Sequence, residues 1–482
     1  MTAARSAQGG QDADEFDVEE ALALVKNPGP HPSAAQSRAG STPAGPRGGD
    51  RTPAPGPGAQ DDAKDKHAHH KATPWPEARV VAERAARSVP RRDPVSVPLD
   101  AALGLVLASP LTALTDLPSF DTSAMDGWAV AGPGPWEVRD DGVLAGNAAP
   151  ERLTDGEAVH IATGARVPRD ATAVLRSEHG RIDDKGRLHA RPAHGHGSAR
   201  QAGNLDVAHG QDIRPRGQEC RSGDQLLPLG ALVTPAVLGL AAAAGYDTLA
   251  VVPRPRVEVL VLGDELLADG LPREGLIRDA LGPMLPPWLR ALGAEVVAVR
   301  RLGDDAAALH KALTGSRADL IVTTGGTASG PVDHVHPMLG RLGSELLVDG
   351  VKVRPGHPMV LARLQDGRHL VGLPGNPLAA VSGLLTLAEP LLRTLAGRAA
   401  PEPYTVPCRE AVQGHPYDTR LVPVSLRGDR AVPLHYSGPA MLRGIAASDA
   451  LAVVPPDGAR AGQELELIDL PWASAGIDAC FV

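Results

Sequence analysis

Four polar motifs in the second half of the chain each follow an apolar segment, and their residue types suit phosphate and metal chemistry. Gly263-Asp264-Glu265 and Gly303-Asp304-Asp305 supply carboxylates, whereas residues 325–330 (GGTASG, with Asp333 close behind) and 374–377 (PGNP) supply glycines ahead of a helix. Glycine lets backbone amides approach an anion, and a helix N-terminus adds partial positive charge, so a phosphate fits at residues 325–329. Carboxylates gathered beside a phosphate repel one another unless a cation lies among them, and their hard oxygens indicate Mg²⁺.

Taken singly, each motif is weak evidence. A glycine pair after a strand is usually a tight turn, and an aspartate pair before a helix usually caps it, so one of Asp304 and Asp305 is expected to be a cap. Taken together, the motifs predict a Mg²⁺-dependent domain that binds a nucleotide or a pyrophosphate. They leave the substrate open.

The apolar segments ahead of these motifs are expected to be strands of one parallel sheet. They alternate with helical patterns, which is typical of parallel strands joined by crossover helices. In such sheets ligands bind beyond the carboxyl ends of the strands, so all four motifs should reach the same edge. The expected strands are residues 257–262, 295–299, 319–324 and 369–373, and the expected helices are residues 282–292, 305–314 and 378–395.

The fold class expected for the whole chain is multidomain α/β, with a central parallel-sheet domain, a β-rich module and a small C-terminal β-barrel or sandwich. Residues 1–75, rich in Pro, Gly, Ala and Ser, are expected to be a disordered tail. The remaining boundaries lie where the sequence changes between helical patterns, short strands with turn residues, and alternating strands and helices. They place a linking domain at 76–116 and 200–254 (with helices at 76–89 and 100–108), the β-rich module at 117–199, the α/β domain at 255–397 and the C-terminal β domain at 398–482.

Composition restricts the function classes. The 482 residues carry a formal net charge of −9 and only 2% aromatics, without a concentrated run of Lys or Arg, so a nucleic-acid partner is not expected. No apolar run approaches the length of a membrane span, and the N-terminus has no apolar export segment, so we expect no membrane partner and a cytoplasmic location. The three widely spaced cysteines favour a reducing compartment without a disulfide framework.

Residues 118–130 (PSFDTSAMDGWAV) form the most specific motif of the chain. They resemble the PxFDNSAMDGYAV signature of MoeA-type molybdopterin molybdenumtransferases, a family that includes the gephyrin E domain. Further motifs match this family in the same order, so the resemblance extends over about residues 75–475. They are IATGA (161–165), DIR (212–214), GDEL (263–266), TGG (324–326) and GLPGNP (372–377).

This resemblance implies an enzyme of molybdenum-cofactor biosynthesis with a molybdopterin-binding-like α/β domain. The implied reaction is the Mg²⁺-dependent cleavage of adenylylated molybdopterin, in which molybdate is placed on the dithiolene and AMP is released. Mg²⁺ is the implied cofactor, and molybdate is a substrate. The resemblance also implies a homodimer, with a molybdopterin adenylyltransferase and acceptor molybdoenzymes as further partners.

Site residues are carried over from the family by motif. Asp126 and Thr163, in the β-rich module, would reach into the active site of the partner protomer as catalytic residues. Glu265, Asp305 and Asp333 would be catalytic acids at the strand ends that serve the metal and the leaving phosphate. The residues expected to bind the pterin nucleotide and the oxyanion are Ser123, Gly263, Asp264, Gly325, Gly326, Ser329, Arg354, His357, Pro358, Gly375, Asn376 and Ser437.

The oxyanion side of this expected site departs from the family pattern. Where the family usually has Lys-Pro-Gly-Lys-Pro, residues 354–358 are RPGHP. Arg354 keeps a permanent charge, whereas His357 is mostly neutral at pH 7 unless an anion raises its pKa. Polar or acidic positions of the family are occupied by Ala280, Leu281, Pro331 and Ala379.

Three functions follow from these patterns. The leading interpretation is a transferase with altered oxyanion affinity, because the retained carboxylates would be unnecessary for binding alone. The alternative is a catalytically weak paralogue that binds the pterin or acts as a scaffold. The related molybdopterin adenylyltransferase shares the Gly-Gly loop domain but lacks the β-rich module, which argues against it.

Overall fold

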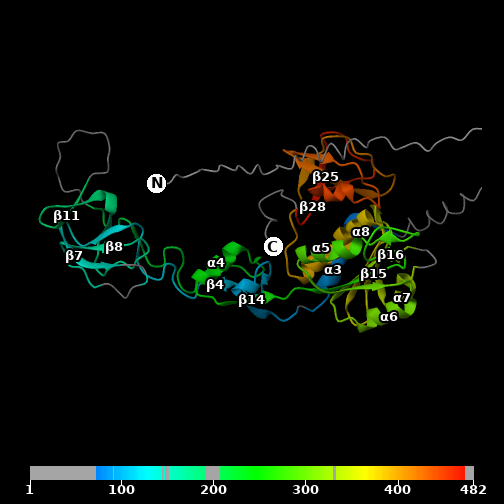
Figure 1. The fold of residues 1–482 in the computed structure, drawn as a ribbon, viewed down its shortest axis with the longest axis horizontal. Helices are drawn as coiled ribbons and strands as arrows, with labels where there is room; N and C mark the ends of the chain where they lie inside the picture. Colours follow the sequence, from blue (N-terminus) through cyan, green and yellow to red (C-terminus); the bar gives the residue numbers. More distant parts are fainter. Residues whose placement is uncertain are drawn as a thin grey trace, which may run out of the picture. The chain divides into compact units, whose positions relative to one another are not determined.

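The computed structural model describes residues 72–90, 92–143, 146, 151–191, 207–328 and 333–472, which form two compact units (Figure 1). The large unit consists of the described residues up to 90 and those from Arg254 onward, and the small unit consists of those from Arg92 to Pro253. Nearly all of the predicted tail, and also Ser329 and Pro331, lie outside the described residues. The Nη2 group of Arg92 donates to the carbonyl oxygen of Pro253 at 2.7 Å, so the inserted small unit begins and ends at one place.

A six-stranded sheet with the order β18-β15-β19-β23-β22-β20 forms the centre of the large unit. The predicted strands are confirmed as a parallel set, and the inner ones are rich in Val, Ile and Leu, as burial on both faces requires. They are β15 (Arg256–Leu262), β18 (Glu295–Leu302), β19 (Leu320–Thr324) and β23 (His369–Leu373). The antiparallel edge formed by β22 (Val360–Arg363) and β20 (Glu345–Asp349) was not expected from the sequence.

The predicted helices of the large unit are present, and one more follows the glycine-rich loop. The new helix is α7 (Val335–Arg341), and the predicted ones are α5 (Leu281–Ala291), α6 (Ala306–Gly315) and the run Pro377–Leu395, which comprises α8 (Pro377–Gly383), a π-helical turn (Leu384–Ala388) and α9 (Glu389–Leu395). Among the described residues, that last run alone is long and apolar enough to cross a membrane. Most of it is buried in the main core of the large unit, where it has the environment of a core helix.

Helix α3 (Trp75–Arg87) belongs to the large unit, so its predicted place in the linking domain is wrong. The indole N–H of Trp75 donates to the hydroxyl of Thr386 at 3.0 Å, and Arg79 pairs with Glu389 at 2.9 Å. Buried alanines let α3 approach α9 and the π-helical turn closely. The sequence pattern indicated a helix with a buried face, but the partners lie about 310 residues away in the chain.

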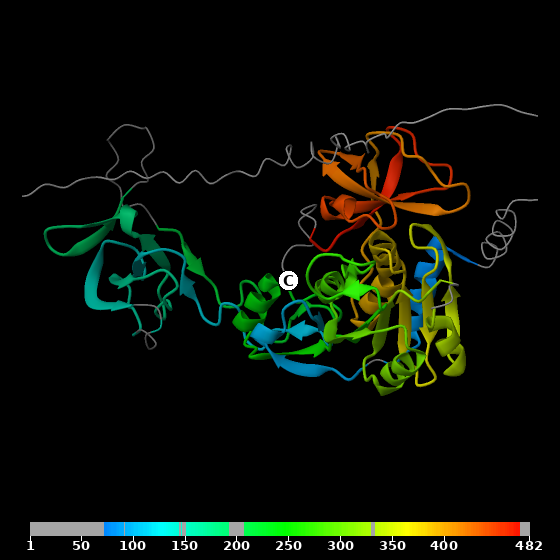
Figure 2. The ribbon, with the colours of Figure 1, turned by 45° about the vertical axis from the view of Figure 1, so that its right-hand side comes forward.

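The last strands of the large unit form a second sheet, as predicted for the C-terminal domain (Figure 2, orange to red). The strands are β24 (Thr405–Pro407), β25 (Thr419–Arg427), β26 (Arg430–Pro433), β27 (Ala450–Val454) and β28 (Glu464–Asp469). This sheet continues through β21 (Val351–Arg354), which pairs with β25, to β1 (Thr73–Pro74). The segment around Arg354 is thereby fixed between the α/β part and the C-terminal sheet.

The small unit contains the predicted β-rich module as a six-stranded sheet, in the order β10-β11-β7-β8-β6-β9. Its strands are β6 (Gly127–Val130), β7 (Trp136–Val143), β8 (Glu157–Ile161), β9 (Ala173–Arg176), β10 (Gly180–Ile182) and β11 (Arg187–Ala190). A second part of the unit holds α4 (Pro235–Ala243) beside a three-stranded sheet of β2 (Val95–Pro98), β14 (Thr248–Val252) and β3 (Val106–Leu107).

The helix predicted at residues 100–108 is wrong. The chain makes a single 3₁₀ turn at Leu99–Ala101 and then enters strand β3. Strand β3 pairs with β14, which lies about 145 residues later in the chain. This long-range ladder outweighs the weak local preference of a short alanine- and leucine-rich segment for helix.

His369 predicts an acid sensitivity of the large unit. It lies at the start of β23 with 1% of its surface exposed, and burial lowers its pKa to about 4. Between pH 6.5 and 4 the unfolded chain binds a proton that the native state excludes, so the free energy of unfolding falls with falling pH, by at most about 3 kcal/mol. Denaturant unfolding of wild type and His369→Leu at pH 7 and pH 4.5 measures this. The variant should lose less stability on acidification, and His310→Leu, at an exposed histidine of α6, should behave like wild type; equal losses in all three proteins would contradict the prediction.

Candidate functional site

The carboxyl ends of the four parallel strands bring the predicted motifs to one edge of the central sheet. The amide of Gly263, after β15, donates to the carbonyl oxygen of Leu302 at the end of β18 at 3.2 Å. The amide of Gly325, after β19, donates to that of Leu373 at the end of β23 at 2.8 Å. The structure therefore assembles these loops side by side, as the sequence predicts.

Two carboxylates lie over glycines at this edge. A methyl group added at Gly303 would lie 2.3 Å from Oδ1 of Asp264, and one added at Gly263 would lie 2.4 Å from Oε2 of Glu265. Both acids are exposed, and neither carboxylate has a hydrogen-bond or ion-pair partner within the described residues. The glycines thus provide the space in which two unpaired negative charges are held at the strand ends.

Asp305 caps a helix, as one of the two neighbouring aspartates was expected to do. Its Oδ1 accepts the amide of Ala307 at 2.7 Å at the N-terminus of α6. Asp304 faces the loop after β19, where its carbonyl oxygen lies 3.2 Å from Nε2 of His334. A pocket of about 10 Å³, room for about one water, lies between these residues and Gly326.

The glycine pair after β19 has a left-handed backbone. Gly325 and Gly326 have φ of +78° and +67°, which other residues rarely adopt. Asp333 lies near His336. A hydrogen bond from His336 to Asp349, together with the negative charges of Asp349 and Asp333, raises the pKa of His336.

The predicted trio of metal ligands is not assembled. Within residues 72–472, wherever the chain is described, no group of three or more His, Cys, Asp or Glu side chains lies close enough to hold a metal ion. Glu265 stays over Gly263, Asp305 uses one oxygen for its helix, and Asp333 acts on His336. A metal at this edge would need oxygen ligands from the substrate.

The predicted oxyanion residues gather around the start of α8. A methyl group at Gly356 would lie 3.0 Å from the carbonyl oxygen of Ala379, and one at Gly375 would lie 3.7 Å from the Cα atom of Gly325. The amides of Leu378 and Ala379 donate to the carbonyl oxygen of Pro439 at 2.9 and 3.2 Å. The structure thereby brings together the loops that carry Arg354, His357, Pro358, Gly375, Asn376 and Ser437.

Arg354 and His357 have structural partners that the sequence did not reveal. Nε of Arg354 donates to Oδ2 of the fully buried Asp418 at 2.8 Å. Nδ1 of His357 donates to the carbonyl oxygen of Val351 at 2.8 Å. These contacts fix the two side chains that stand where the family usually has lysines.

Asp279, which precedes the departures Ala280 and Leu281, is also structural. Its carboxylate accepts the amide of Gly282 at 2.8 Å and so caps α5, and it pairs with Arg301 at 2.6 Å. Leu281 is buried in the main core. Ala280 and Leu281 therefore lie at the start of α5, where Leu281 packs into the core.

In the small unit, Asp126 and Thr163 lie side by side. Oδ1 of Asp126 accepts the amide of Thr163 at 2.7 Å, and both residues are exposed. Ser123 is fully buried and its hydroxyl donates to the carbonyl oxygen of Met125 at 2.5 Å. Ser123 shapes the loop that carries Asp126, and its contact with the ligand stays a prediction.

An open hollow of about 460 Å³ lies next to Asp126 on the module. Its other lining residues were not among the predicted site residues, although Trp128 belongs to the signature and His160 directly precedes the IATGA motif. Its lining is Asp126, Gly127, Trp128, Gly142, Val143, His160, Ile161, Ala162 and Ser177.

Family models cover nearly all of the described residues. Residues 73–245 match the MoeA N-terminal region (domains I and II), residues 258–394 a probable molybdopterin binding domain, and residues 405–470 the MoeA C-terminal region (domain IV).

Individual proteins match over similar lengths. A protein of Mycobacterium tuberculosis named molybdopterin molybdenumtransferase 2 is 36% identical over 427 residues, covering 81% of this chain and 98% of the relative. A Staphylococcus aureus molybdopterin molybdenumtransferase is 26% identical over 396 residues, covering 78% and 90%. The crystal structure of a MoeA protein from Pyrococcus horikoshii superposes with a TM-score of 0.65 at 25% identity, covering 83% and 99%.

Because Asp279 is buried, we expect it to contribute to the stability of the fold that carries the site. Asp279→Ala removes the acceptor for the amide of Gly282 and leaves Arg301, whose side chain is 45% exposed, to be solvated by water, so we expect a loss of about 1–2 kcal/mol in the free energy of unfolding. Chemical denaturation of the purified variant measures this loss. Asp269→Ala is the control, since the side chain of Asp269 is 98% exposed and reaches Arg278 only at 3.8 Å, and it should leave stability unchanged. Equal stability of the two variants would contradict the structural role of Asp279.

Proposed function

The chain belongs to the MoeA family of molybdenum-cofactor biosynthesis proteins, and we propose that it catalyses the Mg²⁺-dependent insertion of molybdate into adenylylated molybdopterin with release of AMP. The observation that carries this proposal is the pair of unpaired carboxylates, Asp264 and Glu265, beside the left-handed glycine pair at the strand ends. Exposed acids without cationic partners, next to a glycine-rich loop, suit a phosphate that arrives with a cation.

The donor set fits Mg²⁺ when the phosphate of the substrate is included. In proteins Mg²⁺ is usually held by one or two carboxylates together with substrate phosphates and water. Glu265 and Asp264 would be the direct ligands, and Asp305 and Asp333 would add negative charge around them. When bound, Mg²⁺ screens the charge on the phosphate that leaves with AMP.

The residues of the large unit bind and orient the reacting groups. The amide of Gly326 would hold the pyrophosphate, in which a water oxygen bonds to the phosphorus on the pterin side while the P–O bond to AMP breaks and its electron pair leaves with AMP. Arg354, with Asn376 and Ser437 in the neighbouring loops, would hold the molybdate. A guanidinium fixed by Asp418 keeps its permanent positive charge, which attracts an oxyanion.

On the module, Asp126 would contact the substrate. The amide of Thr163 orients its carboxylate, which stays exposed beside the hollow as a hydrogen-bond acceptor. The scaffold alternative gains no support from a specific contact. We extend the proposal to a cytoplasmic homodimer that receives its substrate from an adenylyltransferase and passes its product to acceptor molybdoenzymes.

Reconstitution tests the proposed reaction. Purified protein receives adenylylated molybdopterin, Mg²⁺ and increasing molybdate, and the readouts are AMP release and activation of a cofactor-free molybdoenzyme. Glu265→Gln should lower AMP release about 100-fold, because it removes a charged ligand where charge develops. Glu295→Gln is the control, since Glu295 is exposed and begins β18, at the amino ends of the strands and away from the site. Tight substrate binding by wild type without either product, at any molybdate concentration, would reject the transferase.

Gly303 offers a second test at the same edge. An alanine there is compatible with the backbone, but its methyl group would lie 2.3 Å from Asp264 and must displace that carboxylate. We expect the Mg²⁺ concentration for half-maximal AMP release to rise about tenfold in Gly303→Ala. Gly315→Ala is the matched control, because a methyl group at this end of α6 meets open space. An unchanged Mg²⁺ dependence in Gly303→Ala would exclude Asp264 as a ligand.

A further inference from the structure

The hollow on the β-rich module has the size and lining of a small-molecule site. Its volume of about 460 Å³ lies within the roughly 300–1,000 Å³ of typical ligand pockets. Trp128, Val143 and Ile161 give it buried apolar walls, while Asp126 and His160 add one acceptor and one imidazole at its rim. Few polar groups among apolar walls are typical of small-molecule sites.

A bulge in strand β7 opens this hollow. In the parallel β7–β8 ladder, Arg139 pairs with Val159 and Val143 with Ile161, so three residues of β7 stand opposite His160 alone. The last of these three is Gly142, where an added methyl group would lie 3.6 Å from the Cβ atom of His160. The missing side chain at Gly142 leaves the space beside His160 open.

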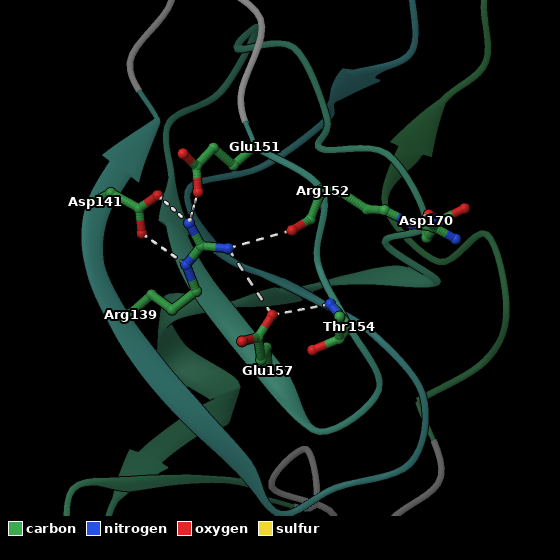
Figure 3. A network of polar contacts seen from close by, with 7 residues as sticks. All are labelled: Arg139, Asp141, Glu151, Arg152, Thr154, Glu157 and Asp170. Carbon is green, nitrogen blue, oxygen red and sulfur yellow. Dashed lines mark hydrogen bonds and ion pairs between the residues drawn. The ribbon is translucent and has the colours of Figure 1, made fainter.

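An ion cluster holds the bulge in place (Figure 3). Nε of Arg139 donates to Oδ1 of Asp141, in the bulge, at 3.0 Å, and Nη2 donates to Glu151 at 2.8 Å. Nη1 of Arg139 donates to the carbonyl oxygen of Arg152 at 3.2 Å, and Glu157, which begins β8, accepts the amide of Thr154 at 2.8 Å. The guanidinium thus ties the bulge to the segment that leads into β8, so the hollow is a built feature of the module.

Trp128 fixes the proton on His160. The indole N–H of Trp128 donates to Nε2 of His160 at 3.2 Å, and the ring centroids lie 5.0 Å apart. An indole N–H is a donor only, so Nε2 is the acceptor and the neutral imidazole carries its proton on Nδ1. His160 therefore offers one N–H donor of defined position next to the acceptor Asp126.

We propose that this hollow binds the pterin ring of the substrate, with Asp126 accepting from its aminopyrimidinone edge and His160 Nδ1–H donating to a ring acceptor. The assignment rests on the proposed function for the presence of a pterin. The aminopyrimidinone edge places two N–H donors side by side, which suits a carboxylate with two acceptor oxygens. Adenine, the other ring of the substrate, presents one donor beside one acceptor and suits a carboxylate less well.

Fluorescence titration of the full-length protein with 6-hydroxymethylpterin, and separately with AMP, tests the assignment. Gly142→Leu fills the hollow, and we expect it to weaken pterin binding at least about tenfold while AMP binding is unchanged. Asp140→Leu is the matched control, because Asp140 is in the same bulge and exposed but does not line the hollow. His160→Ala should weaken pterin binding, and His160→Gln, which keeps a side-chain N–H donor, should weaken it less.

Three results would overturn the assignment: no pterin binding by wild type at millimolar concentration, equal pterin affinity in Gly142→Leu and wild type, or loss of AMP binding in place of pterin binding. Thermal unfolding of each variant shows whether the module is folded. The result is separable from that of the reconstitution. If wild type releases AMP and Gly142→Leu keeps its pterin affinity, only the assignment of the hollow is rejected. If pterin binds in the hollow and no AMP is released, only the transferase is rejected.

Discussion

The parallel pairing of β15, β18, β19 and β23 is the constraint on which the large unit depends. Parallel strands end at the same edge, so each crossover helix returns the chain to deliver another loop there. That one rule brings together the carboxylates after β15, the cap of α6, the glycine pair after β19 and the start of α8, from segments up to about 110 residues apart in the chain. The position of the C-terminal sheet also depends on this arrangement, since the carbonyl oxygen of Pro439, in a loop of that sheet, accepts hydrogen bonds from the start of α8.

Burial divides the acidic residues into two groups with different roles. Asp279 and Asp418 are buried, and each is paired with an arginine that compensates its charge. Asp264 and Glu265 are exposed and lie against glycines, with no cationic partner among the described residues. A buried carboxylate without a partner would be costly, whereas an exposed one stays available to a ligand. The pairing therefore separates the two structural acids from the two that are accessible at the strand ends.

Sequence reasoning predicted what local patterns encode. Apolar segments followed by glycine and aspartate identified the parallel strands and their shared edge, and two separate family motifs, at 118–130 and 161–165, pointed to Asp126 and Thr163. It failed where the deciding partner is distant in the chain: Thr386 for α3, β14 for β3, Asp418 for Arg354. The signature motif also led to the expectation that Ser123 contacts the ligand. A motif identifies a loop, but it does not distinguish the residue that shapes the loop from the residue that the loop exposes. The hollow beside His160 depends on an irregular ladder register that no periodicity reveals.

The hydrogen bond between Arg92 and Pro253 has a consequence for the evolution of this two-unit chain. The large unit is interrupted between α3 and β15, and the small unit that fills the interruption begins and ends at neighbouring atoms. A folded unit whose two ends meet can be spliced into a host loop, lengthened or exchanged without stretching the host, since the gap that it must bridge stays constant. The module that carries Asp126 and the sheet that carries Glu265 could therefore have had separate histories before a single gene joined them.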